Sequence, residues 1–245
     1  MTHTADAAGK PLPTLRHVWL LLIAPPILFL ASIVVASLYF GSTSGDAQTI
    51  ADKVVGELPV ILAAVQLALL GIFERVRRNE RLSLRDLGWQ PSPGQTVWRE
   101  LALGAAAGIA LAIAYLLVLA PLLETAQRSL GDFVPPGQIL PSVSAMPLAF
   151  LLANVVLAPF VEENIYRGYA LARLLPRFGA PVALTLSCVF FGLLHWAGGF
   201  WYILLTGLLA GGCFGALYVW RRNVIVCFAA HLALNTIEFL ASNQA

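Results

Sequence analysis

Long apolar runs separated by short polar segments dominate this chain. A helix needs about 20 apolar residues to cross the hydrocarbon core of a bilayer. Seven runs are close to that length, and in chain order they are residues 18–40, 55–74, 101–123, 147–168, 182–199, 201–220 and 224–242. The first run is too long for a signal peptide, and no convincing small-residue cleavage site follows it. The pattern therefore predicts an all-α fold, a polytopic membrane bundle of about seven transmembrane helices.

The composition agrees with a membrane protein. Hydrophobic residues make up 59% of the 245 residues and charged residues only 11%, and the mean hydropathy is +0.80. Soluble domains average about a quarter charged residues. A net charge of +2, without a basic block carrying interleaved aromatic residues, argues against nucleic acid as a partner. The three cysteines lie in apolar runs at spacings that match no metal or redox motif. The lipid bilayer is the expected surrounding.

The positions of the basic residues predict an orientation. Cytoplasmic loops of membrane proteins carry an excess of Lys and Arg. With the N-terminus inside, 13 of the 15 Lys and Arg residues lie in cytoplasmic segments, and only Lys53 and Arg128 lie outside. We therefore expect a cytoplasmic N-terminus and an outer C-terminus. The Ala- and Leu-rich composition, with Arg preferred over Lys, suggests a bacterial protein of the inner membrane.

One integral membrane domain is expected, with two parts. Residues 1–147 hold the first three helices and their connecting loops, and residues 148–242 hold the remaining helices. Residues 75–100 are predicted to form a cytoplasmic linker. Its segment "LSLRDLGW" is interpreted either as an amphipathic piece near the headgroups or as an ordinary solvated loop.

Polar residues inside the apolar runs are few, and most lie in the second part of the chain. They are Glu57, Asn154, Glu162, Glu163, Arg167, His195, His231, Asn235 and Glu238. Ionisable residues within a membrane are functional candidates by default because burying them is costly. Glu57 and Glu238 both lie near outer helix ends. Glu57 is therefore interpreted as a solvated residue and Glu238 as an interfacial residue.

Three of these residues are predicted to lie at one depth. Glu162 and His195 are 33 residues apart, and their midpoint falls in a turn marked by Gly179. On two antiparallel helices they therefore stand at the same height, about 12 Å below the inner membrane edge. His231 lies eight residues past Asn223 at the start of the last helix, which gives it a similar depth. One carboxylate and two imidazoles thus share a level.

Spacing along the helices predicts which side chains share a face. His231 and Asn235 are four residues apart, as are Phe191 and His195, and residues at that spacing are neighbours on a helix. The first pair forms a polar face, and the second gives His195 an apolar neighbour.

The two adjacent glutamates are predicted to differ. Glu163 and Arg167 are four residues apart and can form an ion pair. Glu162 lies about 100° around the helix and is left free. Pro159 removes a backbone hydrogen bond shortly before the pair and is expected to kink the helix.

Three motifs carry a family resemblance. They are "EENIYRG" (162–168), "FFGLLHW" (190–196) and "HLALN" (231–235). They resemble the EExxxR, FxxxH and HxxxN/D motifs of the CAAX protease and bacteriocin-processing family, also called the ABI or CPBP family. The resemblance covers residues 148–240, and three motifs in order at suitable spacing are specific. Tyr166 stands where members often carry phenylalanine.

The resemblance implies a CAAX prenyl endopeptidase-like, glutamic-type intramembrane peptidase that needs no metal or cofactor. Glu162 matches the water-activating glutamate, with His195 assisting it. His231 and Asn235 match the pair that stabilises the oxyanion. The positions implied to support the site are Glu163, Arg167 and Phe191. A membrane-anchored or prenylated peptide or protein is the implied substrate.

Other functions remain open from sequence. A zinc protease could use Glu162, His195 and His231 as ligands, although HExxH is absent and Asn235 would then have no ligand role. The same residues could instead form a polar network in a non-catalytic scaffold or immunity protein. A proton-coupled carrier with Glu162 as its relay is a third alternative.

Overall fold

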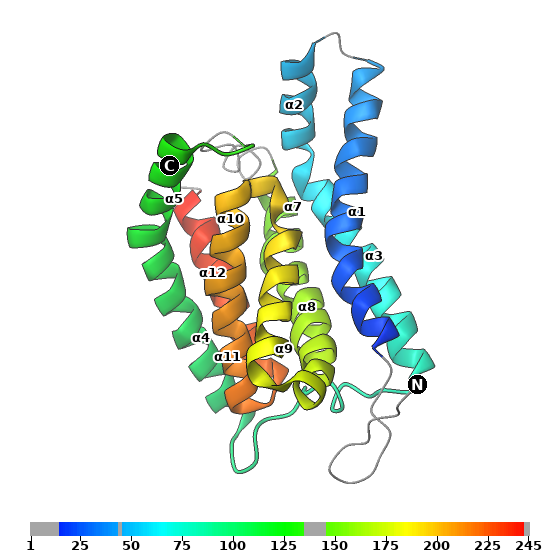
Figure 1. Cartoon of the computed structure of the whole chain (residues 1–245), viewed down its shortest axis with the longest axis vertical. Coiled ribbons are helices and arrows are strands. Elements are labelled where there is room, and N and C mark those ends of the chain that lie inside the picture. The colour runs from blue at the N-terminus through cyan, green and yellow to red at the C-terminus, as the bar shows by residue number, and fades with distance from the viewer. Residues whose placement is uncertain (1–14, 44–45, 135–145, 243–245) are drawn as a thin grey trace.

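The computed structural model describes residues 15–43, 46–134 and 146–242, and these ranges contain helices and turns but no strand (Figure 1). The α-helices are α1 (Arg16–Gly41), α2 (Ala47–Gly56), α3 (Leu58–Asn79), α4 (Val97–Ala114), α5 (Ala120–Leu130), α7 (Pro147–Phe150), α8 (Ala158–Glu163), α9 (Ala172–Leu194), α10 (Phe200–Leu205), α11 (Gly212–Arg221) and α12 (Val224–Ser242). Wider π-helical turns continue several of them, namely η1 (Tyr115–Leu119), η2 (Leu151–Leu157), η3 (Asn164–Leu171) and η5 (Thr206–Gly211), and η4 (Trp196–Gly198) is a 3₁₀ turn.

Six described helical segments are long and apolar enough to cross a membrane. They are Arg16–Gly41, Leu58–Asn79, Val97–Leu130, Pro147–Leu194, Phe200–Arg221 and Val224–Ser242. The fourth contains 48 residues but reverses direction at Gly179, where φ is 74° and ψ is 168°. Because α9 then packs back against η3, this segment passes through the bundle twice (Figure 1). The predicted polytopic bundle of about seven transmembrane helices is confirmed.

One predicted span has the wrong outer boundary. Residues 182–199 were expected to be one continuous helix, but α9 ends at Leu194. His195 caps it with φ −93° and ψ 20°, and the short turn η4 follows. The two glycines at 198 and 199 end this turn before α10 begins, so His195 lies at a helix end rather than within a helix.

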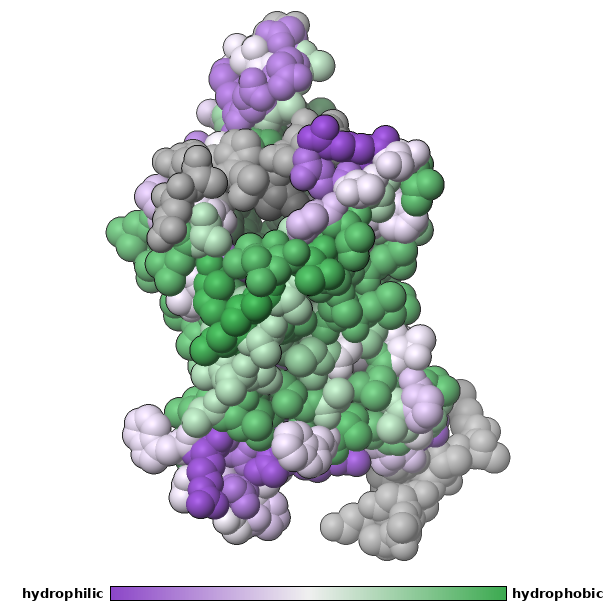
Figure 2. Space-filling view, turned by 90° about the vertical axis from the view of Figure 1, so that its left-hand side faces the viewer, coloured by the Kyte–Doolittle hydropathy of each residue, from purple (hydrophilic) through white to green (hydrophobic). Residues whose placement is uncertain are grey.

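The surface matches a lipid environment. Figure 2 shows an apolar belt between two polar ends of the molecule. Large apolar side chains such as Leu38, Leu117 and Leu148 are exposed on described helices. In Figure 1 the described chain starts and ends at opposite ends of the bundle, as an odd number of passes requires. The protein is therefore an integral membrane protein. Lys10, which contributed to the predicted orientation, lies outside the described residues.

The loop before α4 packs against the bundle, so both interpretations of "LSLRDLGW" are incomplete. Ser83 to Asp86 are exposed, but Leu87 is fully buried. The Gly88 carbonyl accepts a hydrogen bond from the Val224 amide at 2.9 Å. The Trp89 indole donates to the side-chain oxygen of Asn164 at 2.8 Å. The loop thus packs against η3 and α12 at one end of the bundle, and these two elements carry residues of the first and third motifs.

A second contact at this end joins three passes. Glu80, which follows α3, accepts hydrogen bonds from Tyr169 at 2.6 Å and from Arg173 at 2.9 Å, and its carboxylate also lies 2.7 Å from Nδ1 of His17. Burial alone would raise the pKa of Glu80, but the hydrogen bonds and the nearby arginine outweigh it and hold the pKa below 4.5. The carboxylate is thereby kept charged at neutral pH and ties α1, α3 and η3 together.

Glycines allow the closest helix contacts. Gly104 and Gly108 of α4 face α12, where an added Cβ would overlap the carbonyl oxygens of Val226 and Ala230. The ladder of Gly207, Gly211 and Gly215 serves the same purpose against α9. An added Cβ at Gly207, for example, would lie 2.8 Å from the carbonyl oxygen of Cys188. Both glycine patterns therefore act as helix-packing motifs.

We expect Gly108→Ala to lower the thermal stability of the detergent-solubilised protein, by about 1–3 kcal/mol, because the added methyl group forces α4 away from α12. Gly71→Ala is the matched control, since nothing lies within 4 Å of its added Cβ in α3. That change should be neutral or slightly stabilising. Equal melting temperatures for the Gly108 variant and the wild type would contradict the close contact.

Candidate active site

The glutamate pair lies where the helix geometry changes. Glu162 and Glu163 end α8, with π-helical turns on both sides, η2 before and η3 after. Pro159 has no backbone N–H, and the widened turn η2 ends two residues before it. Both glutamates are buried, with 4% and 0% of their surface exposed. Burial at this position requires that each carboxylate has polar partners.

One oxygen of Glu163 takes part in an ion-paired network, and the other, Oε2, is buried without a hydrogen-bond partner among the described residues. Its Oε1 lies 2.8 Å from Nη1 of Arg167 and 2.9 Å from Nδ1 of His231. The pairing of Glu163 with Arg167, predicted from their spacing, is present. The contact with His231 was not predicted, because equal depth does not determine which of two adjacent carboxylates an imidazole meets. A carboxylate only accepts hydrogen bonds, so Nδ1 of His231 carries a proton.

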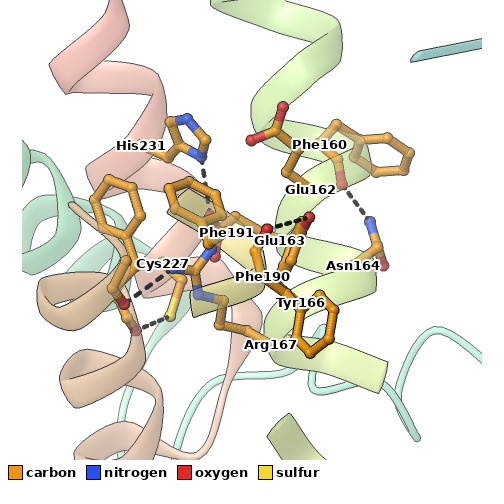
Figure 3. Close-up of polar contacts among 12 residues, drawn as sticks. Phe160, Glu162, Glu163, Asn164, Tyr166, Arg167, Phe190, Phe191, Cys227 and His231 are labelled. Atoms are coloured by element: carbon orange, nitrogen blue, oxygen red, sulfur yellow. Dashed lines mark hydrogen bonds and ion pairs between the residues drawn. The ribbon is translucent and has the colours of Figure 1, made fainter. Parts of the chain in front are cut away.

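Arg167 is held by aromatic rings as well as by charge. Its guanidinium carbon lies 4.4 Å from the ring centre of Phe191 and 5.3 Å from that of Phe214. Its Nη2 donates to the carbonyl oxygen of Gly211 at 3.1 Å. The side chain has no exposed surface, so these contacts and Glu163 replace the water that the cation has lost (Figure 3).

Glu162 has a different environment. Its Oε1 accepts a hydrogen bond from Nε2 of Gln66 in α3 at 2.7 Å. Its Oε2 is buried and has no hydrogen-bond partner among the described residues, and the same is true of Oε1 of Gln66. Figure 3 shows the Glu162 carboxylate projecting from α8 toward the side of α12, where His231 lies, and these two helices are packed together. One oxygen of Glu162 is thus fixed and the other is free.

Phe191 lies between the two histidines. Its ring centre is 5.0 Å from that of His195 and 5.9 Å from that of His231. The Nδ1 atom of His195 lies 2.8 Å from the Phe191 carbonyl oxygen, which can only accept, so this nitrogen carries the proton. In the neutral ring, Nε2 of His195 is then an acceptor.

A cavity of about 50 Å³ brings most of the predicted residues together. His195, His231 and Asn235 line it, with Tyr115, Tyr202 and Glu238 among the other lining side chains. Asn235 donates one hydrogen bond to the Asn154 carbonyl oxygen at 2.8 Å, which leaves its second N–H available. Glu162 is not part of the cavity lining.

The residues do not fit a zinc site. No group of three His, Cys, Asp or Glu side chains in the described ranges is placed to hold a metal ion. The zinc alternative requires Glu162, His195 and His231 to converge. Instead Glu162 bonds to Gln66 and His231 bonds to Glu163.

Two residues of the site were missed or misassigned from sequence. Gln66 was not counted, although it is a lone amide within the apolar run "AAVQLALL". Glu238 was interpreted as interfacial, but it lines the cavity together with His231 and Asn235. The spacing of His231, Asn235 and Glu238 places them on one stripe of a helix, and this spacing could have predicted that Glu238 lines the cavity.

A membrane-embedded helical bundle with a buried glutamate pair, two histidines and an asparagine has the features of an intramembrane protease. Residues 144–237 match the family model of the type II CAAX prenyl endopeptidase Rce1-like domain, and this match includes all three motifs. This part of the chain is therefore similar to that CAAX protease family, in agreement with the resemblance carried by the three motifs. No curated protein and no solved structure matched the chain. Gln66 and Tyr115 lie outside the matched residues.

We expect Glu163→Gln to cost about 3 kcal/mol of stability, because it leaves a fully buried arginine without its counter-charge. Adding Arg167→Met should restore part of that loss. Glu124→Gln is the matched control, since Glu124 pairs with Arg128 at the same spacing but with both side chains more than half exposed. Its effect should stay within about 1 kcal/mol. Thermal denaturation in detergent measures all four proteins, and a Glu163 variant as stable as wild type would contradict the network.

Proposed function

We propose that this protein is a glutamic-type intramembrane endopeptidase that hydrolyses a peptide bond of a membrane-anchored or prenylated substrate, with Glu162 activating the attacking water. The family match supports endopeptidase activity in general. We infer further that the protein lies in a bacterial inner membrane with its N-terminus in the cytoplasm, as its charge distribution predicts. Residues 148–242 would form the catalytic part and residues 1–147 the supporting helices.

The difference between the two glutamates carries this proposal. A general base needs an available lone pair on an oxygen that can approach the proton it removes. Glu163 already holds Arg167 and His231 with one carboxylate oxygen. Both glutamates keep a buried Oε2 without a described partner, but a proton taken up by Glu163 would leave the buried Arg167 without its counter-charge. Glu162 has no ion pair among the described residues, and Gln66 holds its other oxygen in place. Glu162 is therefore the base, and Glu163 supports the site.

Gln66 also suits a role in holding the water. Oε2 of Glu162 and Oε1 of Gln66, like Oε2 of the adjacent Glu163, have no hydrogen-bond partner among the described side chains. A buried water molecule is stable when it makes two to four hydrogen bonds. One water can donate its two protons to Oε2 of Glu162 and Oε1 of Gln66, which leaves its lone pairs directed toward a substrate carbonyl carbon.

The remaining residues supply the steps after attack. The water oxygen bonds to the carbonyl carbon while Glu162 takes a proton, and the carbonyl oxygen becomes an oxyanion. Asn235 can donate its free N–H to that oxyanion, and His231 can donate through Nε2 when its ring carries both protons. Each such donor is typically worth about 3 kcal/mol. The C–N bond then breaks, and the leaving amine receives the proton from Glu162, assisted by Nε2 of His195.

We expect Glu162→Gln to abolish hydrolysis, by a factor of at least about 10², because it keeps shape and hydrogen bonding but removes the base. The melting temperature should stay close to that of wild type. The assay is cleavage of a membrane-anchored reporter by purified protein in liposomes, with and without exhaustive chelation. Wild-type activity should survive chelation.

Three outcomes would contradict this assignment. Cleavage by the Glu162 variant, together with a stable but inactive Glu163→Gln variant, would make Glu163 the base. One tightly bound zinc whose removal stops turnover would favour the zinc protease. Equal reporter processing in membranes with and without the protein would favour a non-catalytic scaffold.

Gln66→Met tests the positioning role separately. The methionine side chain has a similar size but cannot bond to Glu162 or to a water. We expect kcat to fall about tenfold with KM and the melting temperature nearly unchanged, since the bond acts on the base and not on substrate binding. An unchanged kcat would contradict a role for Gln66 in catalysis. A lower melting temperature with a proportional loss of active protein would make its role purely structural.

A further inference from the structure

The cavity contains a second carboxylate that the proposed mechanism does not use. Glu238 lies three residues past Asn235 and seven past His231 on α12, and all three side chains line the cavity. These spacings correspond to one stripe of a helix. Glu238 therefore faces the same space as His231 and Asn235, the two residues proposed to stabilise the oxyanion.

Glu238 has no counter-charge there. No hydrogen bond or ion pair to its carboxylate is found in the part of the chain that the structure describes, and no Lys or Arg is among the cavity-lining residues. Tyr115 and Tyr202, which line the same cavity, are neutral. A carboxylate within a membrane bundle is costly unless a specific partner compensates it. A cationic group entering the cavity with the substrate would provide that partner.

The rest of the wall suits a long cationic side chain. The cavity is otherwise lined mainly by leucines and aromatic rings, including Leu111, Leu119 and Leu205. Apolar surface of this kind can bury the aliphatic stem of Lys or Arg while its charge meets a carboxylate. The two tyrosine rings can also contribute favourable cation–π contacts.

A polar contact fixes the helix that carries Tyr202. Asp132 accepts hydrogen bonds from the amides of Phe200 at 2.7 Å and Trp201 at 3.3 Å, so it caps the start of α10. Burial alone would raise the pKa of Asp132, but these hydrogen bonds outweigh it and hold the pKa below 3.8. The cap is therefore charged at neutral pH, and this side of the cavity is held in a fixed position.

The separation along α12 gives the position of the cation in the substrate. Seven residues of helix span about 10 Å, and an extended peptide advances about 3.3 Å per residue. We propose that Glu238 is a specificity-determining subsite that binds a Lys or Arg side chain three residues from the hydrolysed bond. This inference rests on the proposed peptidase function. It narrows the substrate class to membrane-anchored peptides with a basic residue at that position.

The test uses a library of lipid-anchored peptides, randomised at four positions on each side of the cleaved bond, with the full-length protein in liposomes. Mass spectrometry of the products should show Lys or Arg enriched about tenfold at one position, three residues from the bond. Glu238→Gln should remove this preference, so that basic and neutral peptides are cleaved at equal rates. The control is Glu124→Gln, which removes an exposed carboxylate of α5 that does not line the cavity. This variant should keep the preference for Lys or Arg.

Binding separates this inference from the peptidase proposal. The same library is bound to Glu162→Gln and to the double variant that adds Glu238→Gln, and retained peptides are sequenced. Basic peptides should be retained by the first variant and not by the second, even if no peptide is cleaved. Cleavage or retention without a charge preference, or a preference that survives Glu238→Gln, would overturn the subsite.

Discussion

A fully buried arginine is the constraint on which the rest of the site depends. Arg167 has no exposed surface, so its charge must be balanced within the bundle. Glu163 provides that balance and at the same time holds His231. Because Glu163 balances this charge, its neighbour Glu162, which bonds only to the neutral amide of Gln66 among the described residues, is the carboxylate that we propose for chemistry. Of the two adjacent glutamates, Glu163 thus belongs to the stabilising network and Glu162 is the candidate base.

The departures from regular helix serve the same arrangement. The glutamate pair ends the short α-helix α8, and the π-helical turns η2 and η3 flank this helix on both sides. A third π-helical turn, η5, ends at Gly211, whose carbonyl oxygen accepts a hydrogen bond from Arg167. Such turns are frequent at functional sites because they re-aim side chains and free backbone groups. Gly211 also has no side chain, so Phe191 can approach it closely. Local irregularity here brings a carbonyl oxygen and an aromatic ring to the buried cation.

The sequence predicted those features that depend on local spacing. Apolar run lengths gave the membrane passes, Gly179 gave the reversal, and the four-residue spacing gave the pairing of Glu163 with Arg167. Contacts between distant helices were not predictable in this way, because periodicity shows a face but not what packs against it. For that reason Gln66 was missed, Glu238 was assigned to the interface, and Leu87 was expected outside the bundle.

The site also extends beyond the residues that match the protease family. Gln66 on α3 holds the candidate base, and Tyr115 on η1 lines the cavity, yet both precede residue 144, where the match begins. Without α3, Glu162 would keep two buried oxygens and lose its only described hydrogen-bond donor. The three motifs therefore carry the proposed chemistry, whereas α3 holds the candidate base and η1 lines part of the cavity. Changes in these helices can alter rate and specificity in a protein whose motifs stay the same.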